Sequence, residues 1–172
     1  MYTAVCLQEL RCLQEHYKEL DDPCRVAVRE FTQEEDKDVQ MDKQLMHACS
    51  RAVKTFCKDM LGDASTKPGD VMTCLIKSKQ EPDMPAKCRA GIEHHQLLTL
   101  TDYRFSFKLK QACKDDVTRH CAGEDDKSGV VRCLSQIIRD DVLRSAPTPR
   151  VSAACQHQVT FELLQRVGGS TK

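Results

Sequence analysis

The chain has 172 residues, which is enough for one ordinary domain or for two to three small ones. It contains no Trp, aromatic residues make up 5% and charged residues 30%, so large apolar side chains are scarce and something else must stabilise the fold. The 26 Lys and Arg balance the 26 Asp and Glu, and this zero formal net charge argues against general binding to nucleic acid or to an anionic membrane surface.

In chain order, the first predicted helix starts at Asp22-Pro23, which suit the N-cap and N1 positions, and it carries Cys24. After an acidic connector at 34–38, apolar residues recur at helical spacing between positions 45 and 60 and predict a second helix. A turn at 67–70 separates this helix from a third over 71–78, which we expect to return antiparallel to it.

The same order recurs in the second half of the chain. Apolar residues at helical spacing between 109 and 121 predict one helix, and the turn at 126–129 precedes another over 130–138. Thr148-Pro149 suit the N-cap and N1 positions of a last helix. The predicted fold class is therefore all-α, an elongated array of tandem disulfide-stapled helical repeats with about three helical segments per unit.

The cysteines recur along the chain with a fixed offset. Cys49 and Cys57 return 64 residues later as Cys113 and Cys121, and Ala precedes the leading cysteine of both pairs. Each pair is followed by a Cys-Leu dipeptide and by a fourth cysteine. The two sets of four are Cys49, Cys57, Cys74 and Cys88, and then Cys113, Cys121, Cys133 and Cys155. Such a period is typical of repeat architectures.

This spacing divides the chain into three parts. Residues 1–36 hold the third and fourth cysteines of a truncated unit, whereas 37–100 and 101–172 are complete cysteine-rich repeats. Because a next unit would start near residue 180, we expect the chain to be cut at both ends. A targeting signal and a membrane anchor are expected outside these residues, since no signal peptide and no apolar run of about 18 residues is present.

Helical geometry restricts the disulfide pairing. Cysteines eight apart on one helix lie about 12 Å from each other, whereas a disulfide needs Cα atoms roughly 4.4–6.8 Å apart. In a helical hairpin the second cysteine should face the third, which leaves the first to pair with the fourth. The predicted pairs are Cys49–Cys88, Cys57–Cys74, Cys113–Cys155 and Cys121–Cys133. Four cysteines allow two other connectivities, which stay open, as does the pairing of Cys6, Cys12 and Cys24.

Neither a metal site nor a catalytic site is predicted. His47 and His120 lie close to Cys49 and Cys121, as zinc ligands would, but the chain has no Cys-x-x-Cys and the repeated cysteine spacing carries no matched His. The missing Cys-x-x-Cys also argues against a redox or nucleophilic cysteine. We therefore expect no enzyme activity, no cofactor and no metal ion.

The linker before the last unit holds the best candidates for a contact surface. Tyr103, Arg104, Phe105 and Phe107 are of the residue types that dominate interface hot spots. The alternative is that these side chains pack one unit against the next, as stacked repeats require.

Several stretches of the chain resemble a known repeat. Residues 101–105, 110–117, 120–121 and 131–134 resemble the cysteine-rich repeat of a Golgi glycoprotein family that is also known as cysteine-rich fibroblast growth factor receptor or E-selectin ligand. Residues 10–31 look like an early repeat of the same family.

The resemblance implies a type I membrane protein whose lumenal region is a long array of these units. It implies residence in the Golgi membrane, on the lumenal side, with the cell surface or the extracellular space as further locations. The implied partners are fibroblast growth factors, E-selectin and the transforming growth factor beta system. We expect a non-catalytic, protein-binding repeat region, and the alternative is a structural spacer that projects other binding regions and has no ligand site of its own.

Overall fold

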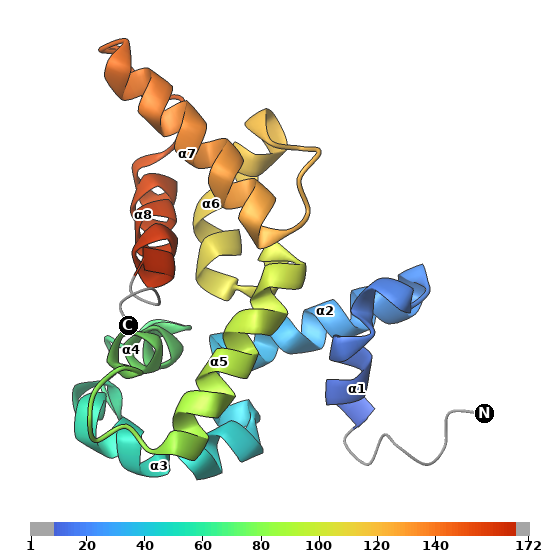
Figure 1. Ribbon diagram of the computed structural model, residues 1–172, viewed down its shortest axis with the longest axis vertical. Helices are drawn as coiled ribbons and strands as arrows, with labels where there is room; N and C mark the ends of the chain where they lie inside the picture. The colour runs from blue at the N-terminus through green and yellow to red at the C-terminus, as the bar shows by residue number, and fades with distance from the viewer. Residues whose placement is uncertain (1–8, 168–172) are drawn as a thin grey trace.

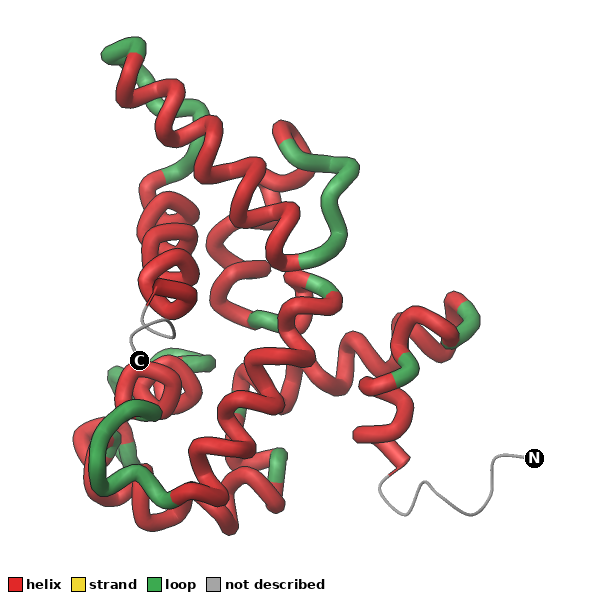
Figure 2. The backbone as a smooth tube through the Cα atoms, in the orientation of Figure 1, coloured by secondary structure: helices red, strands yellow, loops and turns green. Residues whose placement is uncertain are grey.

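The structure, a computed structural model, describes residues 9–167, and this range is built from helices joined by loops, without a strand (Figures 1 and 2). The predicted all-α class is confirmed. No helix in the described range is long and apolar enough to span a membrane. The α-helices and 3₁₀ helices are α1 (Glu9–Glu15), η1 (Tyr17–Glu19), α2 (Asp22–Lys37), η2 (Val39–Met41), α3 (Lys43–Phe56), η3 (Lys58–Met60), α4 (Asp70–Ser78), α5 (Ala86–Thr101), η4 (Tyr103–Phe105), α6 (Phe107–His120), α7 (Lys127–Leu143) and α8 (Ala153–Val167).

The helices themselves repeat with the period of the cysteines. α2, η2 and α3 return 64 residues later as α5, η4 and α6, with the same lengths. Both 3₁₀ helices start in the same way, because the carboxylates of Asp38 and Asp102 accept a hydrogen bond from the backbone N–H two residues on. The second helix of each unit differs, since α4 has 9 residues and α7 has 17.

Four disulfides hold the two complete units together internally. Their pairs are the ones that the cysteine spacing predicts. Cys49–Cys88 and Cys113–Cys155 have Cα–Cα distances of 4.7 Å each, and Cys57–Cys74 and Cys121–Cys133 have 6.0 and 6.1 Å. Each bridge contributes about 2–4 kcal/mol, chiefly by restricting the unfolded chain, which compensates for the small amount of apolar surface.

Each disulfide-bonded unit has its own hydrophobic core. One core of buried residues lies entirely between Val39 and Ile92, and another lies between Tyr103 and Val159. A third, smaller cluster joins Tyr17 and Val28 of the N-terminal part to Phe105. Each complete unit therefore has a core of its own, and the third cluster joins the N-terminal part to the second unit.

The expected antiparallel return of the second helix is wrong in both units. Gly69, next to the start of α4, donates its N–H to Lys37 O at 2.9 Å, and Tyr103 donates its N–H to Asp125 O, just before α7, at 3.0 Å. The connecting loop thus brings the chain back to the residues that precede the first helix. The second helix starts there and runs towards the far end of the first, as α6 and α7 do in Figure 1.

Two predicted helix starts are also corrected. The N-cap of α2 is Asp21, whose carboxylate accepts a hydrogen bond from Cys24 N at 3.0 Å, so Asp22 is already inside the helix. α8 starts at Ala153, not at Thr148-Pro149. Arg150 holds the intervening segment by donating its backbone N–H and its Nε to the Asp141 carboxylate at 2.8 and 2.6 Å. Residues 144–152 therefore form the connection from α7 to α8 and are not part of either helix.

Candidate functional site

The linker helix η4 lies at the centre of the molecule, where the N-terminal part meets the second complete unit. Phe105 is fully buried and its ring stands edge-on to that of Tyr17, with ring centroids 4.7 Å apart. Such aromatic pairs add about 0.5–1.5 kcal/mol beyond the area that they bury. Tyr103 is buried as well, within the core of its own unit.

A buried carboxylate organises this linker. Asp102 accepts hydrogen bonds from Arg104 N, Nε and a terminal guanidinium nitrogen at 2.9, 2.8 and 2.7 Å, and Tyr17 donates its hydroxyl to it at 3.1 Å. Arg104 also reaches the Asp125 carboxylate at 3.3 Å. A buried charge is tolerated when it is paired and fully hydrogen-bonded in this way.

The surroundings of Arg104, Tyr17 and Tyr103 raise the pKa of each of these side chains. The hydrogen bonds from its guanidinium to Asp102 raise the pKa of Arg104 above its ordinary value. Burial, and then the neighbouring Asp102 carboxylate, raise the pKa of Tyr17, and burial likewise raises the pKa of Tyr103. Arg104 therefore stays charged across the neutral range, beside the Asp102 carboxylate.

These positions decide between the two interpretations of the linker. Tyr103 and Phe105 are enclosed and do not lie on an exposed contact surface. Tyr103 packs within its own unit, and Phe105 packs that unit against the N-terminal part. The partner in this packing is unexpected, because Phe105 clusters with Tyr17 and Val28 of the N-terminal part. Arg104 and Phe107 are partly exposed, and for them a contact role stays a prediction.

A second buried polar group joins three helices beside the linker. Asp36 of α2 accepts a hydrogen bond from Phe107 N, the first residue of α6, and pairs with His95 Nε2 of α5 at 2.9 Å. A carboxylate at this position also interacts favourably with the positive end of the α6 helix dipole. Nothing local in the sequence marks this contact, because Asp36 and Phe107 are 71 residues apart.

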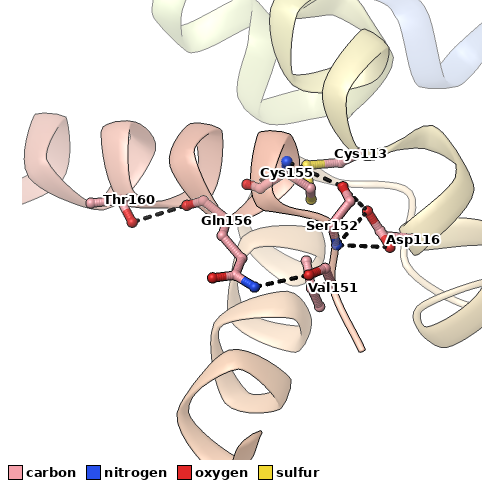
Figure 3. Close-up of a disulfide and its surroundings, with 7 residues drawn as sticks. All are labelled: Cys113, Asp116, Val151, Ser152, Cys155, Gln156 and Thr160. Carbon is pink, nitrogen blue, oxygen red and sulfur yellow. Dashed lines mark hydrogen bonds between the residues drawn. A yellow bond between two sulfur atoms is a disulfide. The ribbon is translucent and has the colours of Figure 1, made fainter. Parts of the chain in front are cut away.

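A third polar contact fixes α8 to α6 next to a disulfide (Figure 3). Ser152 donates its hydroxyl to the Asp116 carboxylate at 2.7 Å, and its backbone N–H points to the same carboxylate at 3.3 Å. Ser152 Oγ in turn accepts a hydrogen bond from Cys155 N at 3.3 Å, which caps the helix. The Cys113–Cys155 bridge and the Asp116 contact therefore hold the same turn of α8.

The N-terminal cysteines do not follow the scheme of the complete units. Cys24 is a free, half-buried thiol, and Cys12 is disulfide-bonded. Cys6 lies outside the described residues. Cys24 occupies the position of a fourth cysteine, whose usual partner is the first cysteine of the same unit, and this chain has no such residue before it in the repeat.

The described range contains several surface clefts and no candidate metal site. A mixed polar and apolar cleft of about 230 Å³ lies between α1, α2, α3 and α5, and residues such as Arg11, Glu35 and His94 line it. This volume is below the usual 300–1,000 Å³ of small-molecule sites, whereas a hollow of about 440 Å³ beside the linker, lined by Tyr17, Arg29 and Arg104, lies within that range. Between residues 9 and 167, no three His, Cys, Asp or Glu side chains lie close enough together to hold a metal ion.

The most exposed apolar side chains lie at the end of α7. Val142 and Leu143 are 72% and 75% exposed, on the part of α7 that extends beyond the body of the molecule at the top of Figure 1. The spacing of the cysteines does not point to these two residues. The signal that could have found them is the pattern of apolar residues after Cys133, which recur at helical spacing as far as Leu143. The corresponding pattern after Cys74 ends at Ile76.

The comparison with known families decides what kind of chain this is. A family model described as a cysteine-rich repeat matches residues 22–83 and again 86–142. The chain belongs to this cysteine-rich repeat family. Each matched range starts with the helix that carries a fourth cysteine, α2 or α5. This start is one helix before the boundaries at residues 37 and 101 that the cysteine spacing predicts.

Curated relatives of this family member carry a common name. Golgi apparatus protein 1 from human and from mouse is 42% identical over 158 residues, which covers 92% of this chain and 13% of each relative. The Golgi apparatus protein 1 homolog of Caenorhabditis elegans is 30% identical over 165 residues, or 92% of this chain and 14% of the relative. The chain thus spans about one seventh of the length of these relatives, whose name supports the Golgi location. No solved structure matches it.

Proposed function

We propose that these residues form a non-catalytic, protein-binding part of a Golgi membrane protein, with fibroblast growth factors and E-selectin as its ligands. Membership in the cysteine-rich repeat family supports a binding or structural role. The disulfide-bonded helices supply what a binding region needs, a stiff framework that loses little entropy when a partner docks. We place the transforming growth factor beta system among the further candidate partners.

The observation that carries the proposal is the exposed end of α7. α7 is longer than α4 although both carry the third cysteine of a unit, so the extra turns are an addition to the framework that the two units share. These turns leave Val142 and Leu143 in solvent beside the exposed Arg139. Exposed aliphatic side chains next to Arg are characteristic of protein-binding surfaces.

Surface plasmon resonance with the immobilised chain tests this proposal. We expect saturable binding of a fibroblast growth factor or of E-selectin, and the double substitution Val142→Ser and Leu143→Ser should weaken it by about ten-fold or more. Leu97→Ser, which changes an equally apolar exposed side chain on another helix, is the matched control and should leave the affinity unchanged. Absence of saturable binding to either ligand would refute the proposal.

A structural spacer is the second candidate function, and the buried linker favours it. Phe105 and Asp102 both contact Tyr17 of the N-terminal part, so their buried side chains join units, which is the behaviour of a rigid array that projects other regions. A spacer would bind neither ligand in the same experiment, and its thermal unfolding would be insensitive to both of them.

A further inference from the structure

One contact in this structure joins units that are not neighbours in the chain. α2, from the N-terminal part, packs against η4 and α6, which belong to the unit at 101–172. Lys110 donates its ammonium N–H to Gln33 Oε1, and Phe107 N donates to the Asp36 carboxylate. As a result Gln33 is only 8% exposed although it lies on a polar helix.

α5 is the copy of α2 one repeat later, and it lacks this cover. Gln33 lies nine residues after Cys24, and the residue nine after Cys88 is Leu97. Asp36 corresponds in the same way to Leu100, one turn further along the same face. Leu97 is 62% exposed and Leu100 is also exposed, so the repeat has leucines in solvent where α2 has covered polar residues.

We propose that the Leu97 and Leu100 face of α5 is the docking surface for the 3₁₀ helix and first helix of a further cysteine-rich unit. Each fourth-cysteine helix would then contact the unit two places further along the chain, as α2 contacts η4 and α6. The array would be held by contacts between second neighbours as well as first neighbours, and this face would not be available to a ligand.

Three observations identify another cysteine-rich unit as the occupant. The structure already contains one interface of this kind, in which α2, the earlier copy of α5, packs against η4 and α6. The unit 37–100 presents matching apolar residues, because Met41 and the partly buried Met46 occupy the positions of Phe105 and Lys110. The relatives are about seven times longer than this chain, so they have room for many such units.

A lengthened chain tests the proposal directly. Residues 1–167 are followed by a second copy of residues 37–100, which has both of its disulfides and its hydrophobic core within itself. The copy carries Leu97→Gln and Leu100→Gln, so that its peptides differ from those of the original unit. Hydroxyl-radical footprinting with mass spectrometry then reports the solvent exposure of the original Leu97.

We expect the oxidation of Leu97 to fall roughly eight-fold on lengthening, which is the ratio between its present exposure of 62% and the 8% of Gln33. Leu143, on a distant helix end, is the control and should be oxidised equally in both chains. In addition, Leu97→Asp should lower the unfolding temperature of the lengthened chain and leave that of the original chain unchanged.

Unchanged oxidation of Leu97 beside an added unit with both disulfides formed would overturn the proposal. A second lengthened chain, which carries a copy of residues 101–172 in the same place, guards against misfolding of the first. If neither added unit forms its disulfides, the result also counts against the proposal, since α5 is supposed to support that unit.

Discussion

The two complete units have the same disulfides and first helices, but they differ in the polar contacts at the start of the third helix. Both have the same two disulfide pairs, the same first helix length and a 3₁₀ linker helix that starts at an Asp. In the second unit Asp116 anchors the start of α8. The corresponding residue of the first unit is Ala52, and the N-cap of α5, Pro85, makes no side-chain hydrogen bond. The disulfides therefore define the repeat, and polar contacts are added to it unit by unit.

The linkers differ even more than the helix ends. Phe105 is fully enclosed by residues of the N-terminal part, whereas its counterpart Met41 is 45% exposed. η4 packs against α2, which belongs to the unit two places before it, and the described residues contain no unit two places before η2. The same linker position is thus part of a core in one repeat and part of the surface in the other.

The largest expected effect is on this linker position. Phe105→Ala should lower the free energy of unfolding by about 3–5 kcal/mol, because it removes a fully buried aromatic side chain and its contact with Tyr17. Met41→Ala should cost about 1 kcal/mol or less, since half of that side chain is already in water. Denaturation in guanidinium chloride measures both. Equal effects would show that the two linkers are not packed differently.

The next effect concerns the bridge between the first and third helices. Replacing both cysteines of Cys49–Cys88 by Ala should cost about 2–5 kcal/mol. The Cys113–Cys155 disulfide closes a loop of similar length, 42 against 39 residues. Replacing its two cysteines by Ala should cost less, because Asp116 still holds α8. Urea denaturation of the two variants compares them. A larger loss for the second pair would contradict the anchoring role of Asp116.

Asp116 itself should show the third effect. Asp116→Ala leaves the N–H and hydroxyl of Ser152 without their partner, which should cost about 1–3 kcal/mol. It should also speed the reduction of Cys113–Cys155 by dithiothreitol and leave Cys57–Cys74 unaffected, as mass spectrometry of alkylated peptides can show. Asp115→Ala, which removes the exposed carboxylate next to Asp116, is the matched control and should change neither rate. Unchanged reduction of Cys113–Cys155 would contradict the prediction.

The smallest expected effect is a pH dependence of stability that arises from Glu35 in α2 and has no counterpart at the same position of α5. Burial, and then the charge of Asp42, raise the pKa of Glu35 above its ordinary 4.5, and the corresponding residue of α5 is Thr99. Because the folded protein holds this proton more tightly, its stability should rise as the pH falls through the raised pKa and level off below 4.5. Glu35→Gln should remove this slope in thermal unfolding measured from pH 7 to pH 4. A slope that persists in the variant would belong to other groups.

The sequence allowed the repeat and the covalent framework to be predicted, since both depend on the spacing of cysteines on regular helices. It did not allow the course of the second helix to be predicted, because the direction depends on where the connecting loop returns, as at Gly69 and Lys37. The role of Phe105 was equally hidden. Its partner Tyr17 is 88 positions away, in a different repeat, and no local pattern links two such residues.

The central claim is that each complete unit is closed by its own two disulfides, and non-reducing tryptic peptide mapping tests it most directly. Lys or Arg residues separate all eight cysteines of the two units in the sequence, so every bridge yields its own pair of linked peptides. We predict the pairs Cys49–Cys88, Cys57–Cys74, Cys113–Cys155 and Cys121–Cys133, with Cys24 as a free thiol. A bridge between the two sets, or free thiols among these eight cysteines, would contradict the account.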